Sequence, residues 1–222
     1  MLIPAKSDIS KIEWRPSPFP DDNSVASSRS RCSYGCNSAK HFRLSPMNWL
    51  NEPKIWQKDD SILSVRSDPK TDFWRLTHDG GIRDSGHLFH RSVSRDFMMT
   101  ATVAGQYREQ YDQSGLMIRL NETDWIKCGI EFVDGRQFVS AVVTRATSDW
   151  SRLPAPNPVP FTFRIQRTQN LVEIFYGEPN SKLELFRQTT FTTENPLQVG
   201  LMTASPAGDG FSTVFSDWTI ES

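Results

Sequence analysis

An Asp134-Gly135 dipeptide between two strand-like runs constrains the fold of this chain more than any other feature. The runs are residues 125–133 and residues 137–144, and both are rich in aliphatic and aromatic side chains. Both central residues of a type I′ turn need a positive φ, which Asp-Gly adopts readily. The dipeptide therefore predicts a two-residue β-hairpin, and its position fixes the register of both strands.

This register gives the hairpin two different faces, because side chains alternate across a strand. The first face comprises Ile126, Cys128, Ile130 and Phe132 opposite Val143, Ala141, Val139 and Gln137. It is apolar except at one glutamine, so we expect it in the hydrophobic core. The second face comprises Trp125, Lys127, Gly129 and Glu131 opposite Thr144, Val142, Ser140 and Phe138. Its mixed character predicts a solvated or ligand-facing surface.

A loop connects the preceding run, residues 116–120, to the hairpin. The length of this loop decides which face of the sheet carries Leu116, Ile118 and Leu120. A four-residue loop would place them on the polar face, whereas a five-residue loop, residues 121–125, places them in the core. Burial of a large apolar side chain is worth about 1.5–3 kcal/mol, so we predict the longer loop. Arg119 then lies on the polar face near Lys127, with Glu131 as the nearby carboxylate.

Length and charge limit the class of protein. The chain has 222 residues, of which 37% are hydrophobic, and its net charge is −1. This is enough apolar material for one domain with a tail, and the charge balance argues against binding to nucleic acid. We also expect no membrane association, since the sequence contains no run of 18 apolar residues and no apolar signal segment.

The cysteines give no sign of a disulfide framework or of a zinc site. Cys128 falls within a predicted strand, where we expect it to be buried. Cys32 and Cys36 have no second pair with which to hold a metal ion. A reducing compartment fits this usage best, so we predict a cytoplasmic location.

Composition divides the chain at about residue 45. Residues 1–45 are rich in proline and serine and poor in large apolar groups, which predicts a flexible N-terminal tail. Residues 46–222 alternate short apolar runs with turn signals, and we expect about ten to twelve strands there. Residues 76–87 and 146–160 are expected to be irregular. The pattern predicts an all-β antiparallel sandwich or jelly roll.

Aromatic side chains near predicted strand ends are candidates for ligand binding. They are Trp74, Tyr107, Tyr111, Trp125 and Trp150. Exposed tryptophan and tyrosine rings can stack on a sugar ring, although such residues also commonly serve as core or edge packing.

The carboxylates bear on whether the chain is an enzyme. Glycoside hydrolysis needs two carboxyl groups close together, and the predicted polar face supplies only Glu131. Asp112 and Asp149 come from flanking segments that could approach it. Histidine pairs with aspartate in His78-Asp79 and in the segment from Asp84 to His87, where loop hydrogen bonding is favoured over a metal site. We therefore assign no catalytic residue, no metal ligand and no cofactor.

Several motifs together resemble a family of uncharacterised concanavalin A-like domains. They are Tyr111-Asp112-Gln113-x-Gly115-Leu116-Met117, Trp125-Ile126-Lys127-x-Gly129-Ile130-Glu131 and Ser148-Asp149-Trp150-Ser151, with Asn51-Glu52-Pro53, Asp72-Phe73-Trp74 and Gly86-His87 in support. The resemblance covers about residues 46–222. It implies a lectin/glucanase-type sandwich of two curved antiparallel sheets. Through a fungal member, it also implies a cytoplasmic role linked to enolase and sugar metabolism.

Three functions remain open on this basis. The first is a non-catalytic regulatory or binding protein with enolase or another metabolic protein as its partner. The second is a carbohydrate-binding module, and the third is a glycan-acting enzyme. For any ligand we predict a concave-face site formed by Tyr107, Tyr111, Asp112, Gln113, Trp125, Lys127, Glu131, Asp149 and Trp150.

Overall fold

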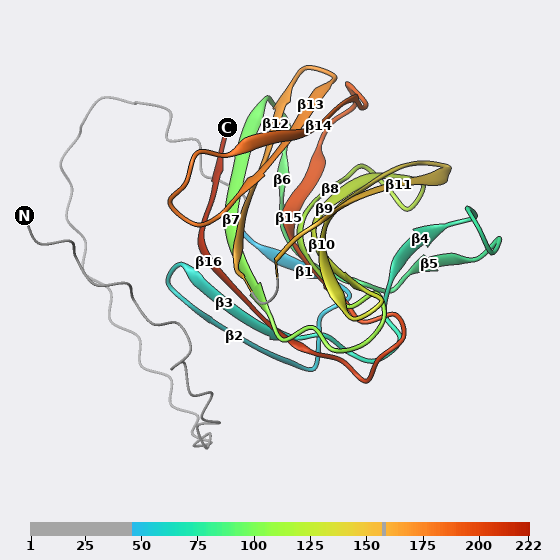
Figure 1. Cartoon of the computed structure of the whole chain (residues 1–222). Helices are drawn as coiled ribbons and strands as arrows, with labels where there is room; N and C mark the ends of the chain where they lie inside the picture. The colour runs from blue at the N-terminus through green and yellow to red at the C-terminus, as the bar shows by residue number, and fades with distance from the viewer. Residues whose placement is uncertain (1–45, 157–158) are drawn as a thin grey trace, which may run out of the picture. The chain divides into compact units, whose positions relative to one another are not determined.

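A computed structural model describes residues 46–156 and 159–222, which form a sandwich of two antiparallel β-sheets (Figure 1). The first sheet contains, in spatial order, β1 (Asn48–Leu50), β6 (His87–Val93), β15 (Leu197–Ala204), β8 (Gln113–Arg119), β9 (Asp124–Val133), β10 (Arg136–Arg145) and β11 (Thr147–Pro154). The second contains β14 (Glu184–Thr190), β13 (Leu171–Gly177), β12 (Phe161–Thr168), β7 (Phe97–Gly105), β16 (Ser212–Glu221), β3 (Ile62–Arg66) and β2 (Ile55–Asp59). The predicted all-β sandwich is confirmed.

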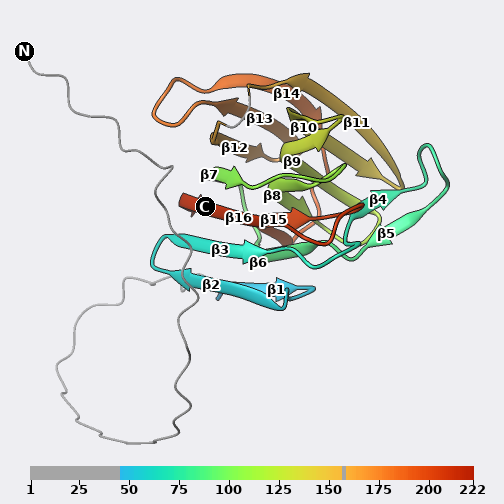
Figure 2. The same cartoon turned by 60° about the horizontal axis from the view of Figure 1, so that its bottom comes forward.

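A third element is a small hairpin of β4 (Phe73–Arg75) and β5 (Ile82–Asp84), which pairs with neither large sheet. Figures 1 and 2 show it projecting from the sandwich on the side of the first sheet that faces away from the second. The first sheet bends toward this hairpin, so the face beneath it is called the concave face below.

The hairpin predicted from Asp134-Gly135 joins β9 to β10. Asp134 has φ 51° and Gly135 has φ 77°, as a type I′ turn requires. The pairing runs from Val133 opposite Arg136 outward to Trp125 opposite Thr144, so the predicted register is confirmed.

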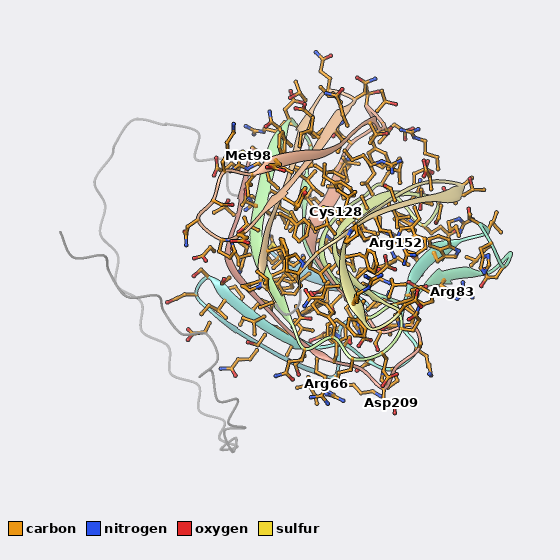
Figure 3. All side chains as sticks on the ribbon, viewed as in Figure 1. Arg66, Arg83, Met98, Cys128, Arg152 and Asp209 are labelled. Carbon is orange, nitrogen blue, oxygen red and sulfur yellow. The ribbon has the colours of Figure 1, made fainter. Side chains whose placement is uncertain are left out.

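The predicted core face of this hairpin is also confirmed, apart from its last residue. Ile126, Cys128 and Ile130 are 0%, 2% and 1% exposed and pack between the two sheets. Figure 3 shows Cys128 in this position, and its thiol is free. Phe132 was expected to be inaccessible, but it is only partly buried. It lies one residue from the end of β9, close to the exposed Asp134-Gly135 turn, where the chain leaves the sandwich.

The preceding strand has its predicted face but not its predicted loop. Leu116 and Ile118 are fully buried in the core. A loop of residues 121–125 would pair Leu120 with Ile126, whereas β8 pairs Ile118 with Ile126. The shift of two residues preserves every face, because the side-chain period of a strand is two. The cause is a tight turn in which Asn121 Oδ1 accepts hydrogen bonds from the backbone amides of Thr123 and Asp124.

Two segments expected to be irregular contain strands. Residues 76–87 include β5, and residues 146–160 include β11. Together with the three-residue strands β1 and β4, they bring the described residues to sixteen strands rather than ten to twelve. Most side chains of β11 are exposed, and β5 is only three residues long. Neither strand has a buried apolar face, so neither shows the alternation by which a strand is recognised.

Two further predictions concern the N-terminal tail and the absence of a membrane-spanning segment. The tail of residues 1–45, with Cys32 and Cys36, lies outside the described residues. None of the described segments forms a helix long and apolar enough to cross a membrane.

The core-face assignment predicts a large effect of truncating Ile130. Ile130→Ala removes a side chain that is 1% exposed and leaves a cavity between the sheets, so we expect a loss of about 2–5 kcal/mol in the free energy of unfolding. Urea denaturation followed by tryptophan fluorescence measures the change. The matched control is Ile62→Ala, since Ile62 is 45% exposed and should cost far less. Equal losses in the two variants would contradict the assignment.

Candidate functional site on the concave face

The polar face of the β9–β10 hairpin is buried, which corrects the expectation of a solvated surface. Trp125 is 0% exposed, Lys127 is 4% exposed and Glu131 is 8% exposed. The β4–β5 hairpin covers part of this face, where Phe73 and Trp125 lie 6.2 Å apart between ring centroids. They belong to a second apolar cluster on the concave side that also contains Leu88, Met117, Val142 and Met202.

Lys127 fastens the covering hairpin to the sheet. Its Nζ donates a hydrogen bond of 2.6 Å to the backbone oxygen of Phe73 and lies 3.6 Å from Asp72 Oδ1. The same carboxylate oxygen accepts a hydrogen bond of 3.2 Å from Gln113 Nε2. The ammonium also lies 5.5 Å from the centroid of the Trp125 ring. Lys127 therefore serves the attachment of the hairpin rather than a ligand.

A cleft of about 880 Å³ lies beside this attachment, between the β4–β5 hairpin and the sheet. The β4–β5 hairpin and the residue before it contribute Asp72, Trp74, Thr77, His78, Asp79 and Arg83. The first sheet and the turn before β8 contribute Tyr111, Gln113, Glu131, Ser148, Asp149 and Trp150. The remaining lining residues are Pro206 and Ala207. Figure 3 shows Arg83 on the hairpin and Arg152 on the facing β11 side. This volume is within the usual range for sites that enclose a small ligand.

Glu131 is held by one of its two carboxyl oxygens. Oε2 accepts hydrogen bonds of 2.7 Å from Ser140 Oγ and 2.8 Å from Trp150 Nε1. Within the described residues Oε1 accepts no hydrogen bond, and it is absent from the buried oxygens that lack a partner, so it is open to the cleft. Burial raises the pKa of this carboxyl, and the nearby Lys127 ammonium opposes that effect.

Two aromatic side chains stand beside this carboxyl group. Trp150 is 36% exposed and Tyr111 is 41% exposed, and their ring centroids lie 6.4 Å apart in an edge-to-face arrangement. Trp150 is fixed through its indole nitrogen by Glu131. Tyr111 adopts a positive φ of 68° at the entry to β8. Exposed rings next to a fixed carboxyl group offer both stacking and hydrogen bonding to a ligand.

The other carboxyl groups of the cleft each have a cation beside them. Asp149 pairs with Arg187 at 2.9 Å, Asp79 pairs with Arg83, and Asp72 lies 3.6 Å from Lys127. The hydrogen bond from Arg83 lowers the pKa of Asp79 to about 2. Among the described residues that line the cleft, Glu131 is thus the acid without a salt bridge.

The structure brings five of the nine predicted site residues into this cleft: Tyr111, Gln113, Glu131, Asp149 and Trp150. Tyr107, Asp112, Trp125 and Lys127 do not line this cleft, so the structure does not bring all nine residues together around it.

Tyr107 and Asp112 have structural partners beside the cleft. The Tyr107 hydroxyl lies 2.6 Å from Ser114 Oγ. Asp112 is 1% exposed, accepts two backbone hydrogen bonds within its own turn, and accepts another of 2.6 Å from Ser205 Oγ. Arg119 also has a different partner from the expected Glu131, because its guanidinium lies 2.7 Å from the Asp84 carboxylate.

Several cleft residues were not predicted, and most of them come from the β4–β5 hairpin. The sequence indicates Trp74 as a candidate aromatic residue and His78-Asp79 as a loop pair. It does not predict the remaining lining residues, which are Asp72, Thr77, Arg83, Ser148, Pro206 and Ala207. The signal that could have found them is the Asp72-Phe73-Trp74 motif, because an apolar pair at the start of a glycine-rich loop indicates that the loop is anchored.

His87, the first residue of β6, has a structural role. His87 Nε2 accepts a hydrogen bond of 2.9 Å from the backbone amide of Asp68, and Nδ1 faces the backbone oxygen of Asn51. Burial lowers its pKa, which favours the neutral ring. In the described ranges no group of three or more histidine, cysteine or acidic side chains is arranged to hold a metal ion.

The fold and the cleft define a β-sandwich protein with a candidate ligand site, and sequence comparison assigns its family. Residues 49–222 match the family described as "Protein of unknown function (DUF1349)", and the chain belongs to that family. It is 34% identical over 183 residues to "Regulation of enolase protein 1" of Saccharomyces cerevisiae, covering 82% of this chain and 92% of the relative. It is 33% identical over 109 residues to "Uncharacterized protein AN7484" of Emericella nidulans, covering 45% and 54% of the two chains.

Solved structures support the same fold. A functionally unknown protein from Saccharomyces cerevisiae superposes with a TM-score of 0.76 and 33% identity, covering 79% of this chain and 96% of that one. A xylan β-1,4-xylosidase from Bacillus halodurans gives a TM-score of 0.61 at 11% identity, covering 72% of this chain and 33% of that one. At this identity the xylosidase shares the fold alone.

The raised pKa of Glu131 predicts a specific pH dependence of stability. Between pH 4.5, the ordinary pKa of a glutamate, and the higher pKa of Glu131 in the fold, the folded chain keeps a proton on Glu131 that the unfolded chain has lost. The contribution of Glu131 to the free energy of unfolding therefore falls as pH rises between these two pKa values. Glu131→Gln keeps an acceptor for Ser140 and Trp150 but cannot ionise. We therefore expect the stability of the variant relative to wild type to increase with pH above 4.5.

Urea denaturation of both proteins from pH 4 to pH 8 measures this difference. Glu173→Gln is the matched control, because Glu173 lies on β13 of the second sheet, where it accepts a hydrogen bond from Gln188. A stability difference between Glu131→Gln and wild type that stays constant with pH would contradict the prediction.

Proposed function

We propose that this chain is a non-catalytic regulatory protein whose concave cleft binds a carbohydrate or a similarly hydroxyl-rich small molecule. The observation that carries the proposal is Glu131, which is fixed through Oε2 and open to the cleft through Oε1. Beside it, Trp150 and Tyr111 expose aromatic surface, and Gln113 adds an amide. Aromatic rings combined with a few oriented polar groups suit a sugar better than a purely apolar ligand.

The regulatory part of the proposal rests on the yeast relative, whose name refers to regulation of enolase. The match covers 92% of that relative, so nearly every part of the relative has a counterpart in this chain. We therefore propose enolase, or another enzyme of sugar metabolism, as the protein partner and the cytoplasm as the location. Ligand occupancy of the cleft would then report the state of sugar metabolism to that partner.

A glycan-acting enzyme is the second candidate, because Glu131 has a raised pKa and Asp72 lies in the same cleft. Hydrolysis of a glycosidic bond needs a carboxylic acid and a second carboxylate placed across the bond. Asp72 instead receives hydrogen bonds at Oδ1 from Gln113 and from the Phe73 amide, and lies beside Lys127. These contacts tie Asp72 to the hairpin attachment, so binding is the better supported function.

Binding measurements with a panel of sugars and with enolase test the proposal. Wild type, Glu131→Gln and Trp150→Ala would each be titrated by calorimetry with β-1,4-linked tetrasaccharides of glucose, xylose and N-acetylglucosamine. We expect at least one sugar to bind wild type and to bind each variant about tenfold or more weakly, because Trp150→Ala removes the stacking ring and Glu131→Gln replaces a charge-assisted hydrogen bond with a neutral one. Glu173→Gln should bind like wild type.

The same samples separate binding from catalysis and from a structural role. A binding protein returns the tetrasaccharide intact after prolonged incubation, whereas cleavage that disappears in Glu131→Gln would identify an enzyme. If both cleft variants bind every sugar and enolase like wild type and only their melting temperatures fall, then the Glu131–Trp150 contact is structural and the proposal is wrong.

A further inference from the structure

We propose that the cleft selects ligands that carry a positively charged amine, such as an amino sugar, over neutral or acidic sugars of the same size. This inference rests on the proposed function and specifies its ligand class. It comes from the charge of the lining, from the unpaired carboxyl oxygen of Glu131 and from the aromatic rings beside it.

The charge of the lining is the first argument. Four carboxyl groups line the cleft (Asp72, Asp79, Glu131 and Asp149), and Arg83 is the cationic side chain among the described lining residues. Arg187 and Lys127 neutralise two of these acids from outside the lining. Arg83 is itself paired with Asp79, so among the described lining residues a phosphate or a uronic acid would meet carboxylates and no cation without a salt bridge.

Glu131 is the second argument. It is 8% exposed, and its Oε2 accepts hydrogen bonds from the neutral donors Ser140 and Trp150. Within the described residues it forms no salt bridge, and the nearby Lys127 ammonium offsets the effect of burial only in part. Burying a carboxyl group away from water disfavours its ionised form unless an opposite charge lies close by. A ligand ammonium at the open Oε1 would supply that charge, and its hydrogen bond to the carboxylate would be among the stronger kinds.

The aromatic rings are the third argument. Trp150 and Tyr111 meet edge to face at 6.4 Å beside Glu131, and Trp150 is held there by its own hydrogen bond. Aromatic faces attract cations, as the Arg152 guanidinium 4.9 Å from the centroid of the Trp150 ring illustrates. Because Arg152 already occupies that position on Trp150, the exposed Tyr111 ring is the face that a ligand ammonium would use. A carboxylate with exposed rings next to it is a common way of recognising an ammonium group.

The test compares three β-1,4-linked tetrasaccharides that share the gluco configuration and differ in charge: those of glucosamine, N-acetylglucosamine and glucuronic acid. Each is titrated calorimetrically into wild type at a pH where the amine is protonated. We expect the glucosamine tetramer to bind about tenfold or more tightly than the acetylated one. We expect the glucuronic acid tetramer to bind more weakly than either. Glu131→Gln should remove the preference for the amine, whereas Glu173→Gln should keep it.

A measurement on wild type alone guards against a misfolded variant. An ammonium beside Glu131 favours the carboxylate, so binding of the amine should release protons, and the measured enthalpy should change with the ionisation enthalpy of the buffer. The acetylated tetramer should release fewer protons.

Two results overturn the inference and are distinguishable from each other. If the acetylated tetramer binds as tightly as the amine, the preference is wrong while the proposed sugar-binding function stands. If none of the sugars binds, including the neutral tetrasaccharides, both proposals fail.

Discussion

The contact between Lys127 and the β4–β5 hairpin is the interaction on which the candidate site depends. Lys127 arises from the concave face of β9, is 4% exposed, and reaches the Phe73 backbone oxygen and the Asp72 carboxylate. The hairpin pairs with neither large sheet. Its contacts with the first sheet include this buried ammonium, the packing of Phe73 on Trp125, the Arg119–Asp84 salt bridge and hydrogen bonds from Arg75 and Thr77 to Ser148. Without it, the concave face would be an open surface rather than one wall of a cleft.

The same constraint separates the polar groups of the concave face into two roles. The Asp72 carboxylate accepts a hydrogen bond from Gln113 and pairs with the Lys127 ammonium, and these contacts attach the hairpin to the sheet. Glu131 is satisfied on one side by Ser140 and Trp150 and remains open on the other. A buried polar network is favourable when its members have partners, and an unsatisfied group within it indicates either strain or function. The open oxygen of Glu131 and its place in the cleft lining are the basis of the proposed function.

The sequence predicted those features that follow from local periodicity and turn chemistry. Asp134-Gly135 determined the register of β9 and β10, and the alternation of Ile126, Cys128 and Ile130 identified the core face. Sequence could not show that the opposite face is covered, because the cover is a short hairpin whose strands lack alternation. The burial of Trp125 and the role of Lys127 follow from that tertiary contact, as does the use of Asp84 rather than Glu131 as the partner of Arg119.

Hydrogen–deuterium exchange of Lys127→Met tests the central claim most directly. Methionine keeps the length and packing of the side chain but cannot bond to Phe73 or to Asp72. We predict faster exchange in residues 73–84, which span β4 and β5, and unchanged protection in the β9–β10 core, with Lys182→Met, an exposed lysine, behaving like wild type. Equal protection of residues 73–84 in Lys127→Met and wild type would contradict the account, because the hairpin would then be held without the lysine.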